Sequence, residues 1–370
     1  MRVVADENIP NIERLFGVYA QIKRVPGRSI SSADIADADV LLVRSVTRVN
    51  KSLLENTRVA FVGSATIGTD HIDIEYLREQ GIIFAYAPGC NASAVVQYDL
   101  SVFARLRPNW RNARIGIVGC GNVGGRLYRV LKALGVDVQV YDPFLTRNQV
   151  PDLTDLGRVA ESDILCLHTP LTRNGAHPTE GMLNHEYIDA LPSGSVLINA
   201  GRGEVIDNDA LLQRLLARAD LHVALDVWAC EPHIDRTLVQ TVSIATPHIA
   251  GHSQEGKERG VRMLHDAFLT WQRIPKLDDD PMSSTAHINT TSSDEDTVNR
   301  AILASYDVLE DDRRFRHAVN QANALGPAFD AFRKAYPVRR EFTHYRYNPA
   351  SPDANSLKTL GFLPNLPATN

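Results

Sequence analysis

An arginine, a glutamate and a histidine each follow a short apolar stretch in the second third of the chain. Arg202 follows "SVLINA" between two glycines, Glu231 follows "VALDVW", and His248 follows "VSIATP". Apolar stretches of this length are typical of buried strands, and parallel strands all end at the same edge of their sheet. We therefore expect these three side chains to converge although they lie far apart along the chain.

The three residue types together indicate proton removal from a carboxylate-bearing substrate. A histidine can take up and return a proton near neutral pH, and a carboxylate on its far nitrogen fixes the tautomer and stabilises the imidazolium. A guanidinium is a planar fork that matches a carboxylate. Taken singly, Arg202 could be a surface arginine in a glycine turn and His248 a structural histidine; their recurrence at strand ends favours catalysis.

A glycine motif predicts the cofactor. Gly119-x-Gly121-x-x-Gly124 stands between the strand pattern "RIGIVG" and a helical pattern, and a second strand pattern ends at Asp142. The glycines permit a tight turn, close approach to a pyrophosphate and close packing of helix on strand, while Asp142 can bind the ribose hydroxyls and repel a 2′-phosphate. A bare turn is the alternative, but strand, turn, helix, strand and acid in order favour NAD over NADP.

With NAD beside them, the three residues predict oxidation of a small 2-hydroxy acid. Hydride would move from C2 to the nicotinamide, and His248 would accept the hydroxyl proton. Arg202 would hold the carboxylate and the developing carbonyl, with glycines 201 and 203 letting the backbone crowd against cofactor and substrate. Glu231 would support His248.

Alternating strand and helix patterns predict the scaffold for these residues. Apolar strands separated by helices indicate parallel sheets covered on both faces. We expect strands at 40–44, 59–65, 82–88, 114–119, 136–142, 163–168, 195–200, 221–227 and 242–248, and helices at 93–106, 123–134, 207–218 and 254–273. The polar stretch 275–297 indicates a linker with one short strand near "AHINT" (286–290), and a smaller folded region follows it.

Composition restricts the cellular setting. The 370 residues are 44% hydrophobic and 22% charged with a formal net charge of -5, which argues against a nucleic-acid-binding surface. We see neither a signal peptide nor an apolar run long enough for a membrane helix. Four scattered cysteines fit reduced thiols better than disulfides or a metal site, so we expect a cytoplasmic protein without metal: Cys90, Cys120, Cys166 and Cys230.

The motifs "GIVGCGNVG", "CLHTPL", "LINAGRGEVID", "ALDVWACEP" and "TPHIAG" resemble the D-isomer-specific 2-hydroxyacid dehydrogenases over roughly residues 1–273. The resemblance implies two Rossmann-like, doubly wound α/β lobes: a substrate lobe (1–92 with 254–274) and an NAD lobe (93–253). Beyond the linker at 275–297, residues 298–370 would form a small α+β dimerisation domain, so that the protein is a homodimer.

The resemblance also implies site residues. Arg202, Glu231 and His248 would be catalytic, and Ser45, Thr66 and the residue at 252 would bind substrate. The family usually has tyrosine where His252 stands, so that contact differs here. Residues that would contact NAD are Gly119, Gly121, Asn122, Val123, Gly124, Asp142, Thr169, Ala200, Gly201, Arg202, Asp226 and Gly251.

A phosphorylated substrate would need cations. Arg44, beside Ser45, is the first candidate, weighed against a surface charge at a strand end. The cluster "RREFTHYRY" (339–347) could contribute across a dimer interface, although a solvated face of the small domain is the simpler interpretation. Two rivals remain: another 2-hydroxyacid dehydrogenase, such as one for 3-phosphoglycerate, and a non-catalytic NAD-sensing protein on the same fold.

Overall fold

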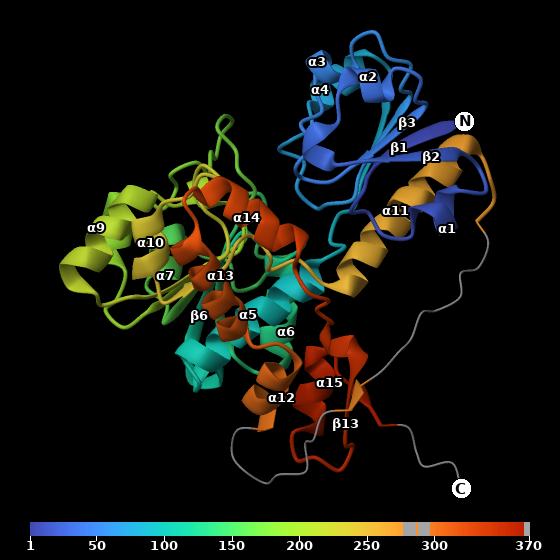
Figure 1. The fold of residues 1–370 in the computed structure, drawn as a ribbon. Helices are drawn as coiled ribbons and strands as arrows, with labels where there is room; N and C mark the ends of the chain where they lie inside the picture. The colour runs from blue at the N-terminus through green and yellow to red at the C-terminus, as the bar shows by residue number, and fades with distance from the viewer. Residues whose placement is uncertain (277–285, 288–296, 366–370) are drawn as a thin grey trace, which may run out of the picture. The chain divides into compact units, whose positions relative to one another are not determined.

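The computed structural model describes residues 1–276, 286–287 and 297–365, and its elements are labelled in Figure 1. By contacts the chain divides into two compact units. Of the described residues, unit 1 contains 1–91 and 252–276, and unit 2 contains 92–251 and everything from 286 onward. The predicted linker lies mostly outside the described residues. The boundaries of the predicted domains stay a prediction.

Unit 1 is a five-stranded parallel sheet with strand order β2-β1-β3-β4-β5. The sequence did not predict β2, because this edge strand keeps only its last residue buried and lacks an apolar pattern. The strands are β1 (Arg2–Asp6), β2 (Gln21–Val25), β3 (Val40–Val43), β4 (Phe61–Ser64) and β5 (Ile83–Tyr86).

Helices cover both faces of this sheet. The long helix α11 (Gln254–Gln272) returns to unit 1, where Phe268 packs against Phe16 and Phe61 in one core cluster. The shorter helices are α1 (Ile12–Phe16), η1 (Gly27–Ser29), α2 (Ser32–Ile35), α3 (Lys51–Leu54) and α4 (Ile74–Glu79).

Unit 2 has a six-stranded parallel sheet with strand order β11-β10-β9-β8-β6-β7, which confirms the predicted doubly wound lobe. Its side chains alternate between two cores: Ile164 and Cys166 face one cluster, and Leu165 and Leu167 face the other. The strands are β6 (Arg114–Val118), β7 (Asp137–Tyr141), β8 (Ile164–Leu167), β9 (Val196–Asn199), β10 (His222–Leu225) and β11 (Ile244–Ala245).

Two layers of helices flank this sheet. Helices α5 and α6 belong to one core cluster, and α7 to α10 belong to the other. Helix α5 begins at Ala92, one residue before the predicted start. The helices are α5 (Ala92–Leu106), η2 (Trp110–Asn112), α6 (Gly124–Ala133), α7 (Leu156–Ala160), α8 (His185–Ala190), η3 (Gly203–Val205), α9 (Asn208–Arg218) and α10 (Arg236–Thr241).

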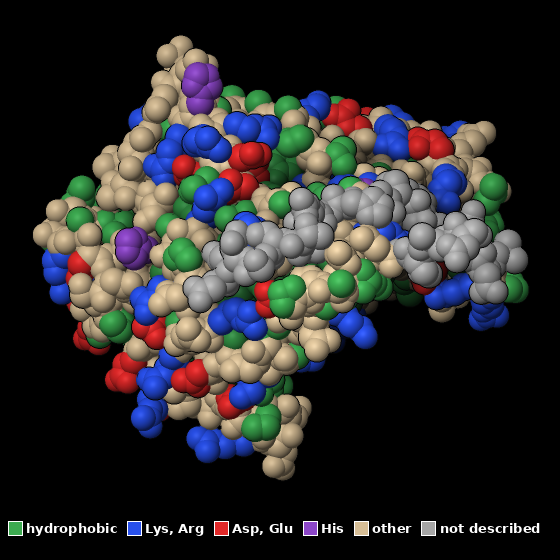
Figure 2. All heavy atoms as spheres, turned by 90° about the horizontal axis from the view of Figure 1, so that it is seen from below, with side chains coloured by type: hydrophobic (Ala, Val, Ile, Leu, Met, Phe, Trp, Pro, Cys, Tyr) green, Lys and Arg blue, Asp and Glu red, His purple; other side chains and the backbone are tan. Residues whose placement is uncertain are grey.

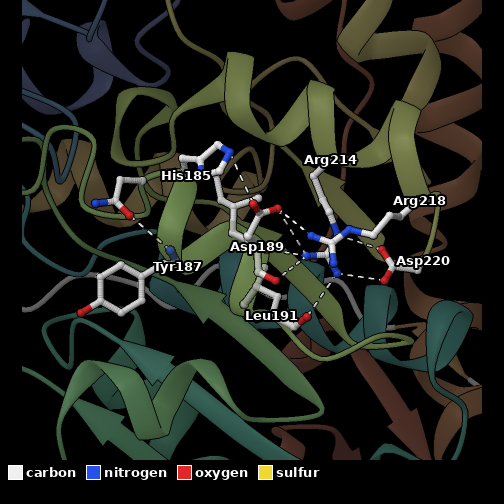
Figure 3. A network of polar contacts seen from close by, with 9 residues as sticks. His185, Tyr187, Asp189, Leu191, Arg214, Arg218 and Asp220 are labelled. Atoms are coloured by element: carbon white, nitrogen blue, oxygen red, sulfur yellow. Dashed lines mark hydrogen bonds and ion pairs between the residues drawn. The ribbon is translucent and has the colours of Figure 1, made fainter.

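A buried arginine joins α8 to α9 (Figure 3). The guanidinium of Arg214 donates to the carbonyl oxygens of Ile188, Asp189 and Leu191 at 2.9, 2.8 and 3.2 Å, where α8 ends. Its other donors form a two-point contact with Asp220, both at 2.9 Å. The hydrogen bonds from Arg214 lower the pKa of Asp220. This clamp ties the C-terminal end of α8 to α9 and to Asp220.

The C-terminal elements pack onto unit 2. Helix α13 lies against the edge strand β11, where the carboxylate of Asp312 accepts a 2.7 Å hydrogen bond from the N–H of Ala245. Edge strands with unpaired N–H groups invite unwanted pairing, and α13 covers this one. The elements are α12 (Thr297–Ser305), α13 (Val308–Gln321), α14 (Leu325–Lys334), η4 (Phe342–His344), α15 (Ala354–Leu360) and a parallel sheet of β12 (Ala286–His287), β13 (Tyr345–Tyr347) and β14 (Leu363–Pro364).

One interpretation of the 339–347 cluster is corrected here. Arg339 is only 6% exposed, so this residue does not belong to a solvated face. It was misjudged because an arginine in a charged stretch normally points to water, whereas tertiary contacts bury this one.

The surface drawn in Figure 2 intersperses Lys and Arg with Asp and Glu side chains. Among the described residues, no helix is both long enough and apolar enough to cross a bilayer. Nor do the described side chains gather three or more His, Cys, Asp or Glu residues into a group that could hold a metal ion.

Candidate active site

His248 and Glu231 form a direct pair in unit 2. The Nδ1 atom of His248 lies 2.8 Å from Oε2 of Glu231, and the side chains are 29% and 21% exposed. The other carboxylate oxygen, Oε1, accepts a 2.9 Å hydrogen bond from the N–H of Trp228. Within the described chain no hydrogen bond engages Nε2 of the histidine. The predicted convergence of these two strand-end residues is therefore present.

The charge of Glu231 is held by its surroundings. Burial alone would raise the pKa of Glu231, but the opposing influence of His248, Arg333 and the Trp228 N–H is greater, and the pKa is lowered. The carboxylate is therefore ionised at neutral pH, so Nδ1 of His248 must carry the hydrogen that they share. Nε2 is then the nitrogen with a lone pair for an incoming proton.

The backbone at His248 is in the left-handed region, with φ of 56°. This conformation costs a non-glycine residue about 1 kcal/mol or more, so it persists only where surrounding contacts hold it. Asp226, 1% exposed, supplies much of that support. Its carboxylate accepts hydrogen bonds from the N–H groups of Ile249 and Ala250, both at 2.8 Å, and its carbonyl accepts from the N–H of His248 at 2.6 Å.

A buried relay completes the support of Asp226. Thr246 donates its hydroxyl to Asp226 at 2.7 Å, and the hydroxyl of Tyr98 lies 2.9 Å from that of Thr246. Burial raises the pKa of Asp226, although His248 and the donated hydrogen bonds oppose the change. Sequence reasoning assigned Asp226 to NAD alone; its observed contacts are with the His248 loop, and contact with NAD stays a prediction.

Arg202 stands at the end of β9, where a buried asparagine shapes its loop. The side chain of Asn199 donates to the carbonyl of Arg202 at 2.9 Å and accepts from the N–H of Gly201 at 3.1 Å. The guanidinium of Arg202 is half-buried, and its Nη1 donates to the carbonyl of Gly201 at 2.8 Å. These hydrogen bonds hold the backbone from which the Arg202 side chain extends.

The glycine after Arg202 is required by the next loop. A Cβ atom on Gly203 would lie 1.9 Å from the carbonyl carbon of Trp228 and 2.4 Å from the nitrogen of Ala229. The backbone at Gly203 thus crowds against the Trp228 peptide of the same protein. Its close approach to cofactor or substrate stays a prediction. Asn208 strengthens the junction, because it donates to the carbonyl of Gly203 at 3.1 Å and accepts from the N–H of Ala229 at 3.3 Å. The Arg202 and Glu231 loops are locked together.

The glycine loop between β6 and α6 is closely packed at Gly124 and open at Gly121. A Cβ on Gly124 would meet the carbonyl oxygen of Gly119 at 1.9 Å, whereas one on Gly121 would meet nothing within 4 Å. Gly119 has φ of 86°, which favours glycine. The side chain of the N-cap residue Val123 makes no hydrogen bond to α6. The N-terminus of this helix is therefore open to an anion at the glycine loop.

Two polar groups beside this loop fit a bound NAD. Asp142 follows β7, and its carboxylate accepts from the N–H of Cys120 at 2.9 Å and of Phe144 at 3.0 Å. The hydroxyl of Thr169 is buried and has no hydrogen-bond partner among the described residues. A buried hydroxyl of this kind needs a partner, which a ligand can supply. Asn122, Ala200 and Gly251 lie on loops of the same unit.

The proposed substrate residues belong to unit 1. Val43 pairs with Ser64 in register, so the loops with Ser45 and Thr66 leave neighbouring strands at one edge. The hydroxyl of Thr66 lies 2.7 Å from that of Ser64, which lies 3.0 Å from Nε2 of His71. His252 also belongs to unit 1.

Arg44 is half-buried directly after β3. Burial lowers the pKa of Arg44, and the negative charge of Asp6 opposes this. No hydrogen bond or ion pair joins the guanidinium of Arg44 to any other described residue.

The comparisons with known proteins agree with this architecture. Residues 100–250 match the family model "D-isomer specific 2-hydroxyacid dehydrogenase, NAD binding domain", and residues 279–361 match a domain of unknown function. A solved 3-phosphoglycerate dehydrogenase from Entamoeba histolytica has a TM-score of 0.62 at 24% identity, covering 74% of this chain and 95% of its own. A D-lactate dehydrogenase from Aquifex aeolicus gives 0.63 at 21% identity, covering 74% and 96%. At these identities the likeness concerns the fold.

Curated relatives extend the likeness to nearly the whole chain. An erythronate-4-phosphate dehydrogenase from Teredinibacter turnerae is 49% identical over 368 residues, 98% of each chain. One from Saccharophagus degradans is 46% identical, covering 98% of this chain and 99% of its own. The chain belongs to the erythronate-4-phosphate dehydrogenase family of D-isomer-specific 2-hydroxyacid dehydrogenases.

Proposed function

We propose that this protein oxidises 4-phospho-D-erythronate to 3-hydroxy-2-oxo-4-phosphooxybutanoate with NAD, in the biosynthesis of pyridoxal 5′-phosphate. The observation that carries the proposal is the 2.8 Å contact between Nδ1 of His248 and Oε2 of Glu231, in the same unit as a glycine loop in which a Cβ on Gly121 would meet no atom within 4 Å. The name that the full-length relatives share supports the choice of substrate.

His248 is the proposed base. The hydroxyl proton of the substrate moves to Nε2 as hydride leaves C2, so that C2 loses two electrons and becomes a carbonyl. Bound NAD supplies the hydride acceptor. Glu231 stabilises the imidazolium that forms on His248, since its carboxylate faces Nδ1.

Arg202 is proposed to bind the substrate carboxylate and the developing C2 carbonyl. The planar fork of a guanidinium suits the two oxygens of a carboxylate. The loop that carries Arg202 is held by a hydrogen bond from Asn199 and by the close packing at Gly203. Loss of a desolvated charge partner costs about 3–5 kcal/mol. Replacement of Arg202 by alanine is therefore expected to lower kcat/KM by about two to four orders of magnitude.

The NAD contacts are assigned to the second unit. The backbone of Gly121 to Gly124 would face the pyrophosphate, and Asp142 would bind the ribose hydroxyls. The hydroxyl of Thr169 offers a buried donor. The remaining contacts are proposed for Gly119, Ala200, Gly201, Arg202, Asp226 and Gly251.

The substrate phosphate is assigned to the first unit. Arg44 supports this because it is a half-buried cation whose guanidinium makes no hydrogen bond or ion pair with another described residue, although the charge of Asp6 acts on it. Ser45 and Thr66 would add hydroxyl donors, and His252 would donate from an imidazole where the family usually has a phenol. We also propose that the protein is cytoplasmic and that it forms a homodimer through its C-terminal residues. Sedimentation equilibrium would test the homodimer.

A substrate comparison tests the function. Purified protein with NAD should turn over 4-phospho-D-erythronate far faster than 3-phosphoglycerate or unphosphorylated erythronate, measured by NADH fluorescence. Faster turnover of 3-phosphoglycerate would replace the proposal by its closest rival. If His248→Asn abolished hydride transfer yet preserved the biological activity of the protein, an NAD-sensing role would replace it.

A further inference from the structure

The C-terminal part of unit 2 reaches the loop that follows His248. Arg339, between α14 and η4, is 6% exposed, and its Nη2 donates to the carbonyl of Ala250 at 2.5 Å. The same nitrogen donates to the carbonyl of Ala94 at 2.7 Å, and Nη1 donates to that of Ile249 at 3.4 Å. This arginine therefore ties the first turn of α5 to the peptides beside His248.

Aromatic side chains hold the guanidinium in place. Its carbon lies 4.2 Å from the centre of the Tyr306 ring, a close cation–π contact. The hydroxyls of Tyr306 and Tyr336 both donate to Asp311, at 3.0 and 2.5 Å. The cation therefore sits in a buried setting, from which it donates hydrogen bonds to three main-chain carbonyls.

The peptides at Ile249 and Ala250 are consequently held from two sides. Asp226 accepts from their N–H groups at 2.8 Å each, and Arg339 donates to their carbonyl oxygens. The two clamping residues, Asp226 and Arg339, lie far apart in the sequence of unit 2. Both act on the turn in which His248 has its left-handed backbone.

We propose that Arg339 is a positioning residue for His248: by holding the carbonyls of residues 249 and 250, it keeps the imidazole in line with Glu231. The C-terminal region then has a function in catalysis within its own chain. The inference rests on the proposed function only where turnover is the measured quantity.

The decisive variants are Arg339→Met and Arg339→Lys. Methionine keeps much of the length and removes the charge and donors; lysine keeps the charge, but a single ammonium cannot reproduce the planar fork. Arg214→Met is the matched control, because Arg214 is equally buried and also donates to three carbonyls, at the end of α8 (Figure 3).

Two readouts separate positioning from general stability. With a base misplaced by about 1 Å, kcat is expected to fall about 10- to 100-fold in Arg339→Met, with less loss in Arg339→Lys and KM for NAD nearly unchanged. Hydrogen exchange, measured by mass spectrometry, should speed up about tenfold at the amides of 248–250. Arg214→Met should loosen residues 185–191 and leave kcat and 248–250 unchanged.

Unchanged exchange at 248–250 in Arg339→Met would overturn the proposal, as would an equal rise there in Arg214→Met. If Arg339→Met does not fold, Arg339→Lys decides by the same measurements. Exchange needs no substrate, so the two hypotheses fail separately. The wild-type protein could be inactive on 4-phospho-D-erythronate while only the Arg339 variants loosen the loop at 248–250. That result would refute the proposed function and support the proposed role of Arg339.

Discussion

Glu231 is the residue whose replacement has the most specific expected signature. Its lowered pKa keeps the carboxylate charged at neutral and mildly acidic pH, where it favours protonated His248. In Glu231→Gln a proton on the His248 ring no longer faces a negative charge across the 2.8 Å contact. The acid limb of the kcat/KM profile for oxidation should move to lower pH, with a reduced maximum.

The same charge also affects stability. A carboxylate whose pKa is lowered by folding stabilises the protein above its ordinary titration range, and the contribution disappears as pH falls through the lowered value. The difference in unfolding free energy between wild type and Glu231→Gln should therefore shrink in acid. If the acid limb of the kcat/KM profile keeps its position in Glu231→Gln, Glu231 does not have its proposed role.

Asp142 should decide between the two nicotinamide cofactors. Asp142→Ala removes charge-assisted hydrogen bonds worth about 1.5–3 kcal/mol, so NAD should bind about 10- to 100-fold more weakly. Discrimination against NADP should narrow, because the repulsion of a 2′-phosphate is gone. Fluorescence titration with NADH and NADPH measures both, and unchanged selectivity would contradict the ribose assignment.

Among the elements, the loops after β9 and β10 pack closely against each other at Gly203. Gly203→Ala places a methyl group against the Trp228 peptide, and overpacking against backbone should cost about 3 kcal/mol. The loops must separate, which displaces Arg202 from Glu231. We expect a lower melting temperature together with a lower kcat, measured by calorimetry and NADH formation.

Gly157→Ala provides the comparison for that variant. Gly157 lies in α7, and a Cβ there would meet only the side chain of Asp155, at 3.2 Å. Alanine is favoured over glycine in helices by up to about 1 kcal/mol, so this variant should be neutral or slightly stabilised. Equal losses in the two glycine variants would argue against the close approach at Gly203.

At the scale of the whole molecule, the C-terminal helices complete the NAD lobe. Phe315 and Phe329 are buried in the same cluster as Trp228 and Leu238, and Asp312 pairs with the edge of β11. Asp312→Ala leaves the Ala245 N–H buried without its acceptor and should cost about 2–3 kcal/mol of unfolding free energy. Denaturant titration measures this.

Glu310 gives the matched surface change on the same helix. It is exposed in the first turn of α13, so Glu310→Ala should alter the unfolding free energy by no more than about 0.5 kcal/mol. A loss in Glu310→Ala as large as that in Asp312→Ala would show that the helix, and not the edge contact, sets the stability.

The sequence by itself determined the parallel-sheet lobes, the glycine loop and the three strand-end residues. Each of these has a local signature: an apolar run, a glycine spacing, or a polar side chain where a run stops. Because parallel strands end at one edge, the approach of Glu231 to His248 followed from topology alone. The edge strand β2 escaped because its side chains are mostly exposed and polar.

Only the tertiary structure decided how the site is held. Four residues bind main-chain groups of the loops that carry Arg202, Glu231 and His248: Asn199, Asn208, Asp226 and Arg339. A hydrogen bond to a carbonyl or N–H leaves no trace in the residue type of its partner. Arg339 acts on peptides that lie 89 and 90 residues earlier. Its burial depends on aromatic neighbours that meet it only in the folded chain.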